Sequence, residues 1–314
     1  MATDISKRSC WEVDLHTIQL TLIDLAKRAG EMIVSAKPVS ATGSGTKKNS
    51  ADLVTETDQA VEHMISSTLL VKYPTFKFLG EETYKPGMRL GPEPTFVVDP
   101  IDGTTNFVHG WQYVSISLGF AIGREPKVGV VYNPFTGKLY TGIQGKGSYV
   151  YDTRTKRTSE GMGEMGQRLP LREPEDLKGL DGTLVAIEWG SDRSGSNWKT
   201  KCDTWQRLGA SKEEGGAMVH SARALGSAAL NLCTVAEGTI DVYWEGGCWP
   251  WDVCAGWVIL VEAGGIIVDG NPGSWEIPVD HRKYLAVRGA NKDGQKQIVE
   301  EFWSCIKGTM HYES

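Results

Sequence analysis

The chain has 314 residues, of which 40% are hydrophobic and 23% charged, a composition typical of a folded globular protein and not of a disordered one. Its 33 Lys and Arg residues and 39 Asp and Glu residues give a formal net charge of −6. We therefore expect no nucleic-acid partner, which would need a basic face, and no polybasic attachment to an anionic membrane.

The sequence also lacks the segments that direct a protein to or through a membrane. The best apolar stretch, 257–268, is interrupted by Glu262 and is shorter than the ~20 residues of a membrane span. Residues 1–11 are polar and have no apolar core of the kind that a secretory signal needs. The six cysteines form no CxxC pair, and we interpret them as reduced thiols. These features favour a cytoplasmic protein.

Two helices are expected first along the chain. Apolar residues recur at helical spacing across 12–36 and again across 58–72, and Pro38 and Pro74 end the two patterns. The intervening segment 40–50 is rich in Gly, Ser, Thr and Lys, but it lacks the glycine spacing of a phosphate-binding P-loop. We interpret it as a basic loop.

Short β-rich segments bounded by Gly or Pro follow the helices. They predict an antiparallel sheet packed on the two helices, with strands at 76–79, 95–98, 113–121, 127–132, 138–141 and 148–151. The polar segment that comes next, 153–182, is expected to contain a surface insertion at 153–168. It also connects an N-terminal α+β domain, residues 1–172, to a C-terminal α/β domain, residues 173–314.

Strands and helices alternate in the C-terminal half, which predicts a mixed or parallel sheet. Strands are expected at 183–187, 217–220, 240–243, 266–268 and 284–287. Helices are expected at 197–208, 225–236, 252–263 and 292–306.

The strongest chemical signal is the run DPIDGTTN at 99–106, directly after an apolar strand. Pro100 and Gly103 shape a tight turn that can aim the carboxylates of Asp99 and Asp102 at one point. Mg²⁺ prefers such oxygen ligands, together with water and substrate phosphate. Backbone N–H groups after Gly103 could open a helix, and helix N-termini bind phosphate. A solvated Asp-Gly turn is the alternative, but it explains only part of the run.

Two weaker acidic signals accompany this run. Glu81 and Glu82 follow the strand at 76–79, where adjacent acids are usually solvated. Asp252 precedes an apolar helix, where it could simply be an N-cap. Several of the eleven tryptophans lie at 244–257, and we expect them to be buried or to line a pocket near Asp252.

Together these motifs resemble the inositol monophosphatase family of Mg²⁺-dependent, lithium-sensitive phosphatases, and its fungal members most of all. The resemblance covers nearly the whole chain and is carried by DLVTETD (52–58), FLGEE (78–82), VDPIDGTTNFVHG (98–110), GVVYNP (129–134) and WDVCAGWVILVEAGG (251–265). It implies a layered αβαβα sandwich.

The resemblance also implies a role for particular residues. Two or three Mg²⁺ ions are expected on Glu81, Asp99, Asp102, Asp252 and the backbone carbonyl of Ile101. Thr104 is expected to orient the attacking water, with Asp58 as its partner. Glu82 is expected to flank the site and to bind a water held by a metal ion. Backbone amides of Gly103 and Thr104 are expected to hold the phosphate, and Lys47 matches a loop lysine near the site. The residues expected to contact substrate are Glu81, Gly103, Thr104, Ser191, Ala228, Glu245 and Asp252.

The implied activity is hydrolysis of myo-inositol monophosphate by metal-activated water, in a homodimer. This agrees with the absence from the sequence of a GxSxG elbow and of histidines at zinc spacing. His109 and His220 are interpreted as packed or surface residues.

Fructose-1,6-bisphosphatases and 3′-phosphoadenosine 5′-phosphate phosphatases usually depart from DGTTNF, which this chain keeps. Another sugar or nucleotide phosphate, or a role beside fungal quinate utilisation, stays open. A non-catalytic regulator is disfavoured because every expected carboxylate ligand is present.

Overall fold

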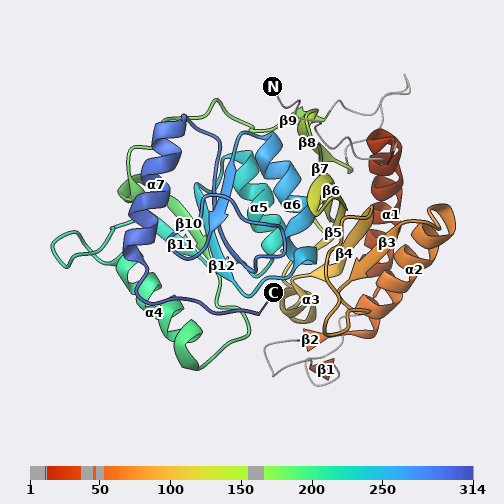
Figure 1. Ribbon diagram of the computed structural model, residues 1–314, viewed down its shortest axis with the longest axis horizontal. Helices are drawn as coiled ribbons and strands as arrows, with labels where there is room; N and C mark the ends of the chain where they lie inside the picture. The colour runs from red at the N-terminus through yellow and green to blue at the C-terminus, as the bar shows by residue number, and fades with distance from the viewer. Residues whose placement is uncertain (1–10, 12, 37–44, 47–52, 155–165, 314) are drawn as a thin grey trace, which may run out of the picture.

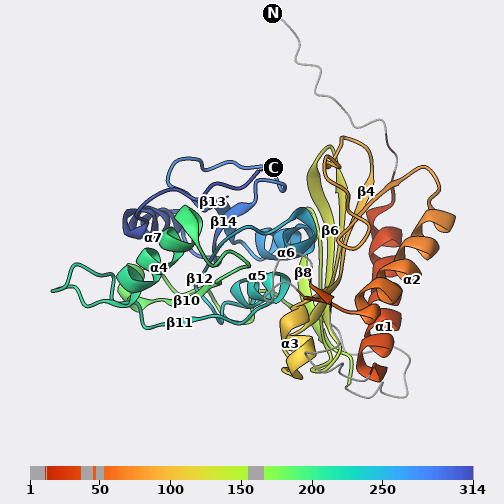
Figure 2. The same ribbon diagram turned by 90° about the horizontal axis from the view of Figure 1, so that it is seen from below.

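The computed structural model describes residues 11, 13–36, 45–46, 53–154 and 166–313. Two β-sheets alternate with three layers of helices, which gives the expected αβαβα sandwich (Figures 1 and 2). Helices α1 (Leu15–Ser35) and α2 (Glu56–Lys72) cover the outer face of the larger sheet, and α5 (Ala228–Glu237) and α6 (Pro250–Glu262) lie between the sheets. Helices α4 (Gly195–Gly209) and α7 (Lys292–Cys305) cover the far side of the smaller sheet.

The larger sheet has seven strands in chain order. They are β3 (Lys77–Gly80), β4 (Thr95–Asp102), β5 (Ser115–Ile122), β6 (Glu125–Asn133), β7 (Lys138–Ile143), β8 (Gly147–Asp152) and β9 (Gln167–Arg168). A separate short pair joins β1 (Gly45–Thr46) and β2 (Leu53–Val54), while α3 (Thr104–His109) follows β4. The expectation of a purely antiparallel sheet was wrong at one edge. There β3 runs parallel to β4, because residues 81–94 carry the chain back before β4 begins.

The smaller sheet is mixed, as expected. Its order is β11 (Ser221–Arg223), β10 (Leu184–Ile187), β12 (Val242–Gly246), β14 (Lys283–Val287) and β13 (Ile266–Asp269). Strand β10 pairs in parallel with β11 and β12, and β14 pairs antiparallel with its two neighbours. The 3₁₀ turn at Leu180–Gly182 precedes β10.

Two elements in the C-terminal half begin later than predicted for reasons that the structure shows. The strand expected at 217–220 lies at 221–223, because the amides of 217–219 bond back to the end of α4 and Met218 takes a positive φ of 55°. Helix α5 begins three residues late, since the amides of Leu225 and Gly226 donate to Glu188 and Ser227 is its N-cap. The insertion expected at 153–168 lies mostly outside the described residues.

Helix α6 approaches the larger sheet at backbone distance. A Cβ added to Gly129 of β6 would lie 2.1 Å from the carbonyl oxygen of Ala255, and one added to Gly142 of β7 would lie 3.2 Å from the Cα of Ile259. The same helix also contacts β13 of the smaller sheet, so it joins the two halves. Within the described ranges, no helix combines the length and the apolarity needed to cross a bilayer.

Candidate active site

A pocket of about 980 Å³ is lined by residues of both halves of the chain. Its walls include eight residues that the sequence analysis singled out: Glu81, Asp102, Gly103, Thr104, Ser191, Ala228, Glu245 and Asp252. They lie at or just after the ends of β3, β4 and β10, within β12, or in the first turns of α3, α5 and α6. Residues as far apart in the sequence as Glu81 and Asp252 therefore line one pocket, as the set of motifs implied.

The aspartates of the central motif lie inside β4, not in a loop after it. The pairing of β4 with β5 shifts register between Asp99 and Asp102, which lets both carboxylates leave the regular ladder. Asp99 accepts a bond from the Ile101 amide at 3.0 Å. Asp102 accepts the Ala229 amide at 2.8 Å and the Ser227 hydroxyl at the start of α5. The N-terminus of α5 thus stabilises the charge of Asp102.

Thr104 and Asp58 are partners, as the resemblance implied. The Thr104 hydroxyl lies 3.2 Å from a carboxylate oxygen of Asp58 and 3.0 Å from the carbonyl oxygen of Ile101. The other carboxylate oxygen of Asp58 accepts the amide and the hydroxyl of Thr55, in the capping box that begins α2. The cap leaves Asp58 one oxygen for Thr104. Glycine at 103 takes a φ of 92°, which favours glycine, and α3 begins directly after it.

Asp252 is not the N-cap of its helix. Helix α6 begins at Pro250, so Asp252 occupies the third helical position, and its carboxylate accepts the Trp249 amide at 2.6 Å. Glu81 reaches the same pocket from the end of β3, where its amide donates to the Val98 carbonyl at 3.1 Å. The larger sheet and α6 therefore each supply acidic groups to the pocket.

The buried carboxylates disfavour one another's ionisation. Burial, and next the charge of Glu81, raise the pKa values of Asp99 and Asp252 well above their ordinary values. Burial is also the largest cause that raises the pKa values of Asp58 and Asp102, each to about 6. A dication would remove this repulsion, and carboxylate oxygens are the ligands Mg²⁺ prefers. Among the described residues, no group of three or more Asp, Glu, His or Cys side chains is arranged in this structure so that it could hold a metal ion.

Ser191, Ala228 and Glu245 also line the pocket. The amide of Ala228 donates to a carboxylate oxygen of Asp102 at 3.3 Å. The hydroxyl of Tyr243 donates to Glu245, and burial followed by the charge of Glu188 raises the pKa of Glu245 to about 7. Aromatic rings also line the pocket, as expected for the Trp-rich segment. Trp249 and Trp251 stack with centroids 5.2 Å apart, and the Tyr84 ring is tilted to them at 4.9 and 5.2 Å.

Asp58, Asp99, Ile101 and Glu82 are not among the residues that line the pocket. Glu82 is half-buried, and its amide donates to Glu62 at 2.7 Å. Lys47 lies outside the described residues. His109 and His220 are exposed, as interpreted.

Two buried glutamates were missed by the sequence analysis. Glu62, 1% exposed, accepts the amides of residues 82 and 83 and so holds the segment after Glu81. Glu188 lines the pocket and accepts the Gly226 amide at 2.9 Å and the Asn231 side chain at 2.9 Å. Glu62 falls on a helix and Glu188 directly after a strand. A charged residue among apolar neighbours was the only signal of either.

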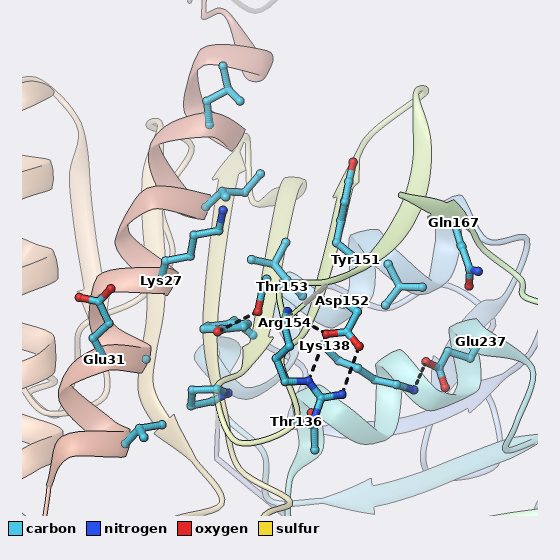
Figure 3. Close-up of a pocket in the computed structure, with 18 of the residues that line it drawn as sticks. Lys27, Glu31, Thr136, Lys138, Tyr151, Asp152, Thr153, Arg154, Gln167 and Glu237 are labelled. Carbon is cyan, nitrogen blue, oxygen red and sulfur yellow. Dashed lines mark hydrogen bonds and ion pairs between the residues drawn. The ribbon is translucent and has the colours of Figure 1, made fainter. Parts of the chain in front are cut away.

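A larger cavity of about 1270 Å³ lies between α1 and the β6–β8 face and shares no lining residue with the acidic pocket. Figure 3 shows its charged side chains. Lys138 bonds to Glu237 at 2.7 Å and Arg154 to Asp152 at 3.1 Å. Because these charges neutralise one another, the cavity does not resemble an anion or cation site.

Comparison with known proteins supports one family. The model of the inositol monophosphatase family matches residues 14–307. Two Saccharomyces cerevisiae proteins, inositol monophosphatase 2 and inositol monophosphatase 1, are 43% and 41% identical to this chain over 95% and 96% of it, and 98% and 99% of their own lengths. The structure of inositol monophosphatase from Anabaena superposes with a TM-score of 0.71 at 25% identity, covering 94% of this chain and 98% of that one. This chain therefore belongs to the inositol monophosphatase family.

Proposed function

We propose that the protein is a Mg²⁺-dependent phosphomonoesterase that hydrolyses myo-inositol monophosphate to inositol and phosphate. The observation that carries the proposal is the convergence, in one pocket, of acidic side chains from both halves with Thr104, whose hydroxyl bonds to Asp58 earlier in the sequence. Family membership and the similarity to yeast inositol monophosphatases support the same activity.

The donor set fits a hard divalent cation. Burial and the neighbouring carboxylates raise the pKa values of Asp99 and Asp252, so a bound cation would stabilise their ionised forms. Glu81, Asp99, Asp102, Asp252 and the Ile101 carbonyl would hold two or three Mg²⁺ ions. When bound, the ions would neutralise the phosphate and favour attack by water on phosphorus.

The chain's own residues position the water. The Thr104 oxygen, with its proton directed to Asp58 or Ile101, has a lone pair free to accept a hydrogen bond from that water. Asp58 fixes the Thr104 rotamer, because its second oxygen is held by the helix cap. A water held in one orientation reaches the attacking geometry without further loss of entropy. Gly103 and Thr104 amides would bind the phosphate, and Glu82 would contact a water beside the metals.

The lining residues Ser191, Ala228 and Glu245 would recognise the leaving group. Glu245 can accept hydrogen bonds from two ring hydroxyls of a polyol, and Ser191 can donate one, while Ala228 leaves room for the ring. The hydroxyl of Tyr243 already donates to one carboxylate oxygen of Glu245, which orients the other oxygen.

We also propose that the protein is a cytoplasmic homodimer and that the boundary between the two domains of each chain lies at 172/173.

The test is phosphate release from EDTA-treated protein with and without added Mg²⁺, measured on inositol, hexose and nucleoside monophosphates and on a small aryl phosphate. We expect release only with Mg²⁺, fastest per mole with inositol monophosphate, and inhibition by millimolar lithium. Higher kcat/KM on a nucleotide or hexose phosphate would replace inositol as substrate. Absence of Mg²⁺-dependent release from every compound would overturn the proposal.

A further inference from the structure

The last described segment, residues 307–313, forms part of the active-site wall; we call it the tail segment. His311, Tyr312 and Glu313 line the pocket. Figure 1 shows the segment leaving α7, passing α4 and ending near the middle of the molecule. Its backbone is fixed by two side-chain amides. Asn271 exchanges two hydrogen bonds of 2.9 Å with Met310, and Asn197 exchanges bonds of 2.8 and 2.9 Å with His311.

The Tyr312 ring packs against the glycine pair that directly follows Glu245. A Cβ added to Gly246 would lie 2.8 Å from the ring, and one added to Gly247 would lie 3.2 Å from it. Only glycine lets the ring come this close. On the other side, the phenol hydrogen-bonds to Asp192, and burial first, with this carboxylate second, raises its pKa. Tyr312 therefore contacts two loops that line the pocket, residues 189–193 and residues 246–249.

Two cations fix this arrangement. The Arg282 guanidinium stacks on Trp249, 3.5 Å from the ring centroid, and donates to the carbonyl oxygens of Gly247 at 2.8 Å and Glu313 at 2.8 Å. The amine of Lys201, a residue 1% exposed, lies 5.7 Å from the Tyr312 centroid. It donates to the carbonyl oxygens of Gly246 at 2.7 Å and Trp189 at 3.2 Å. Arg282 therefore joins the tail segment to the loop at 246–249, and Lys201 joins the two loops to each other beside the Tyr312 ring.

We propose that the tail segment determines leaving-group specificity. Tyr312, held between Arg282 and Lys201, keeps Ser191 on one loop and Glu245 beside the other at the separation that fits a compact polyol. The inference rests on the proposed function and adds a positioning residue to it. Without the ring, Gly246 and Gly247 lose their packing partner, and the pocket becomes wider between the two loops. Polyol phosphates then lose their contacts, whereas a small aryl phosphate, which has no ring hydroxyls, loses less.

The experiment compares Tyr312→Ala, Tyr312→Phe and wild type on inositol monophosphate and on a small aryl phosphate, with a thermal melt of each protein. We expect Tyr312→Ala to raise KM for inositol monophosphate about tenfold, equivalent to ~1.4 kcal/mol, with a smaller change in kcat. The ratio of kcat/KM between the two substrates should fall at least about fivefold. Tyr312→Phe keeps the ring contacts and should recover most of that ratio. The matched control, Lys307→Ala at the exposed start of the segment, should retain the wild-type ratio.

Asn197→Ala is the second variant, because it unties His311 while leaving the Tyr312 ring in the chain. It should lower the substrate ratio in the same direction. An active wild type with an unchanged ratio in both variants, or with proportional losses on both substrates, would overturn the role of the tail segment alone. A wild type without Mg²⁺-dependent phosphate release would overturn the proposed function and this role with it.

Discussion

The acidic residues of the pocket are buried at the expense of folding stability. Asp99 is 2% exposed, and burial together with Glu81, Asp102 and Asp252 raises its pKa. Buried like charges destabilise a folded protein unless a cation compensates them. The site therefore contains mutually repelling carboxylates, which a bound cation would stabilise.

Asp99→Asn should separate activity from stability. The amide keeps the oxygen that accepts the Ile101 amide but removes a charge. Mg²⁺-dependent turnover should fall at least about 10²-fold, since a charged metal ligand is lost. In EDTA at pH 8, the melting temperature should rise by roughly 2 °C or more. Asp24→Asn, on an exposed side chain, should change neither quantity. Turnover near that of wild type would remove Asp99 from the metal site.

Thr104 and Asp58 should act as one unit. Thr104→Ala and Asp58→Asn should each lower kcat by ~10²–10⁴-fold, with smaller effects on KM, because both position the attacking water. The double variant should lose little more than either single variant. Steady-state kinetics on the four proteins measures the coupling. Losses that multiply would show that the 3.2 Å contact has no role in turnover.

Glu245 should make stability depend on pH. Its folded pKa of about 7 exceeds the ordinary value of 4.5, so the folded state binds this proton more tightly than the unfolded state. The resulting stability is complete below pH 4.5 and is lost as pH rises through 7. It amounts to at most about 3 kcal/mol. Glu245→Gln cannot lose this proton, so its melting temperature relative to wild type should rise between pH 5 and pH 8. Exposed Glu276→Gln is the control, and a pH-independent difference would contradict the shift.

At the scale of elements, periodicity and proline placed most helices within two or three residues of their observed bounds. The failures arise where side chains, not local propensity, decide a boundary. Helix α5 starts late because Glu188, forty residues earlier, captures its preceding amides. The motif at 99–106 was visible because its groups are contiguous in sequence. Tyr312 and Arg282 were not, because only the folded chain brings them to the pocket.

Gly129 tests how closely α6 must approach the sheet. Gly129→Ala would place a methyl group 2.1 Å from the Ala255 carbonyl oxygen, and backbone cannot yield as a side chain does. We expect a loss of ~2 kcal/mol or more in unfolding free energy, and lower turnover because Asp252 begins on the same helix. Gly209→Ala is the control, since its added Cβ meets nothing within 4 Å and φ there is ordinary. Equal stability of the two variants would contradict the backbone contact.

At the scale of the whole molecule, two sheets meet through one helical layer, and the pocket lies across that junction. Each sheet with its outer helices has its own apolar cluster, and a further cluster is built around α5 and α6. Local patterns predicted both sheets, whereas their layered arrangement was expected only from the family resemblance, because no local pattern encodes the orientation of one sheet to another.

Helix α6 lies within the core that the two halves share, and this position has a consequence for cooperativity. A helix with backbone contact to one sheet and packing on the other cannot detach by a local fluctuation, since leaving would expose the apolar cluster built around α5 and α6. Asp252 therefore cannot be released from the pocket by partial opening. In a urea titration, loss of turnover and loss of helical circular dichroism should share one midpoint. The amides of α6 should be among the last to exchange with deuterium, so the protein should lose its chemistry only when it loses its fold.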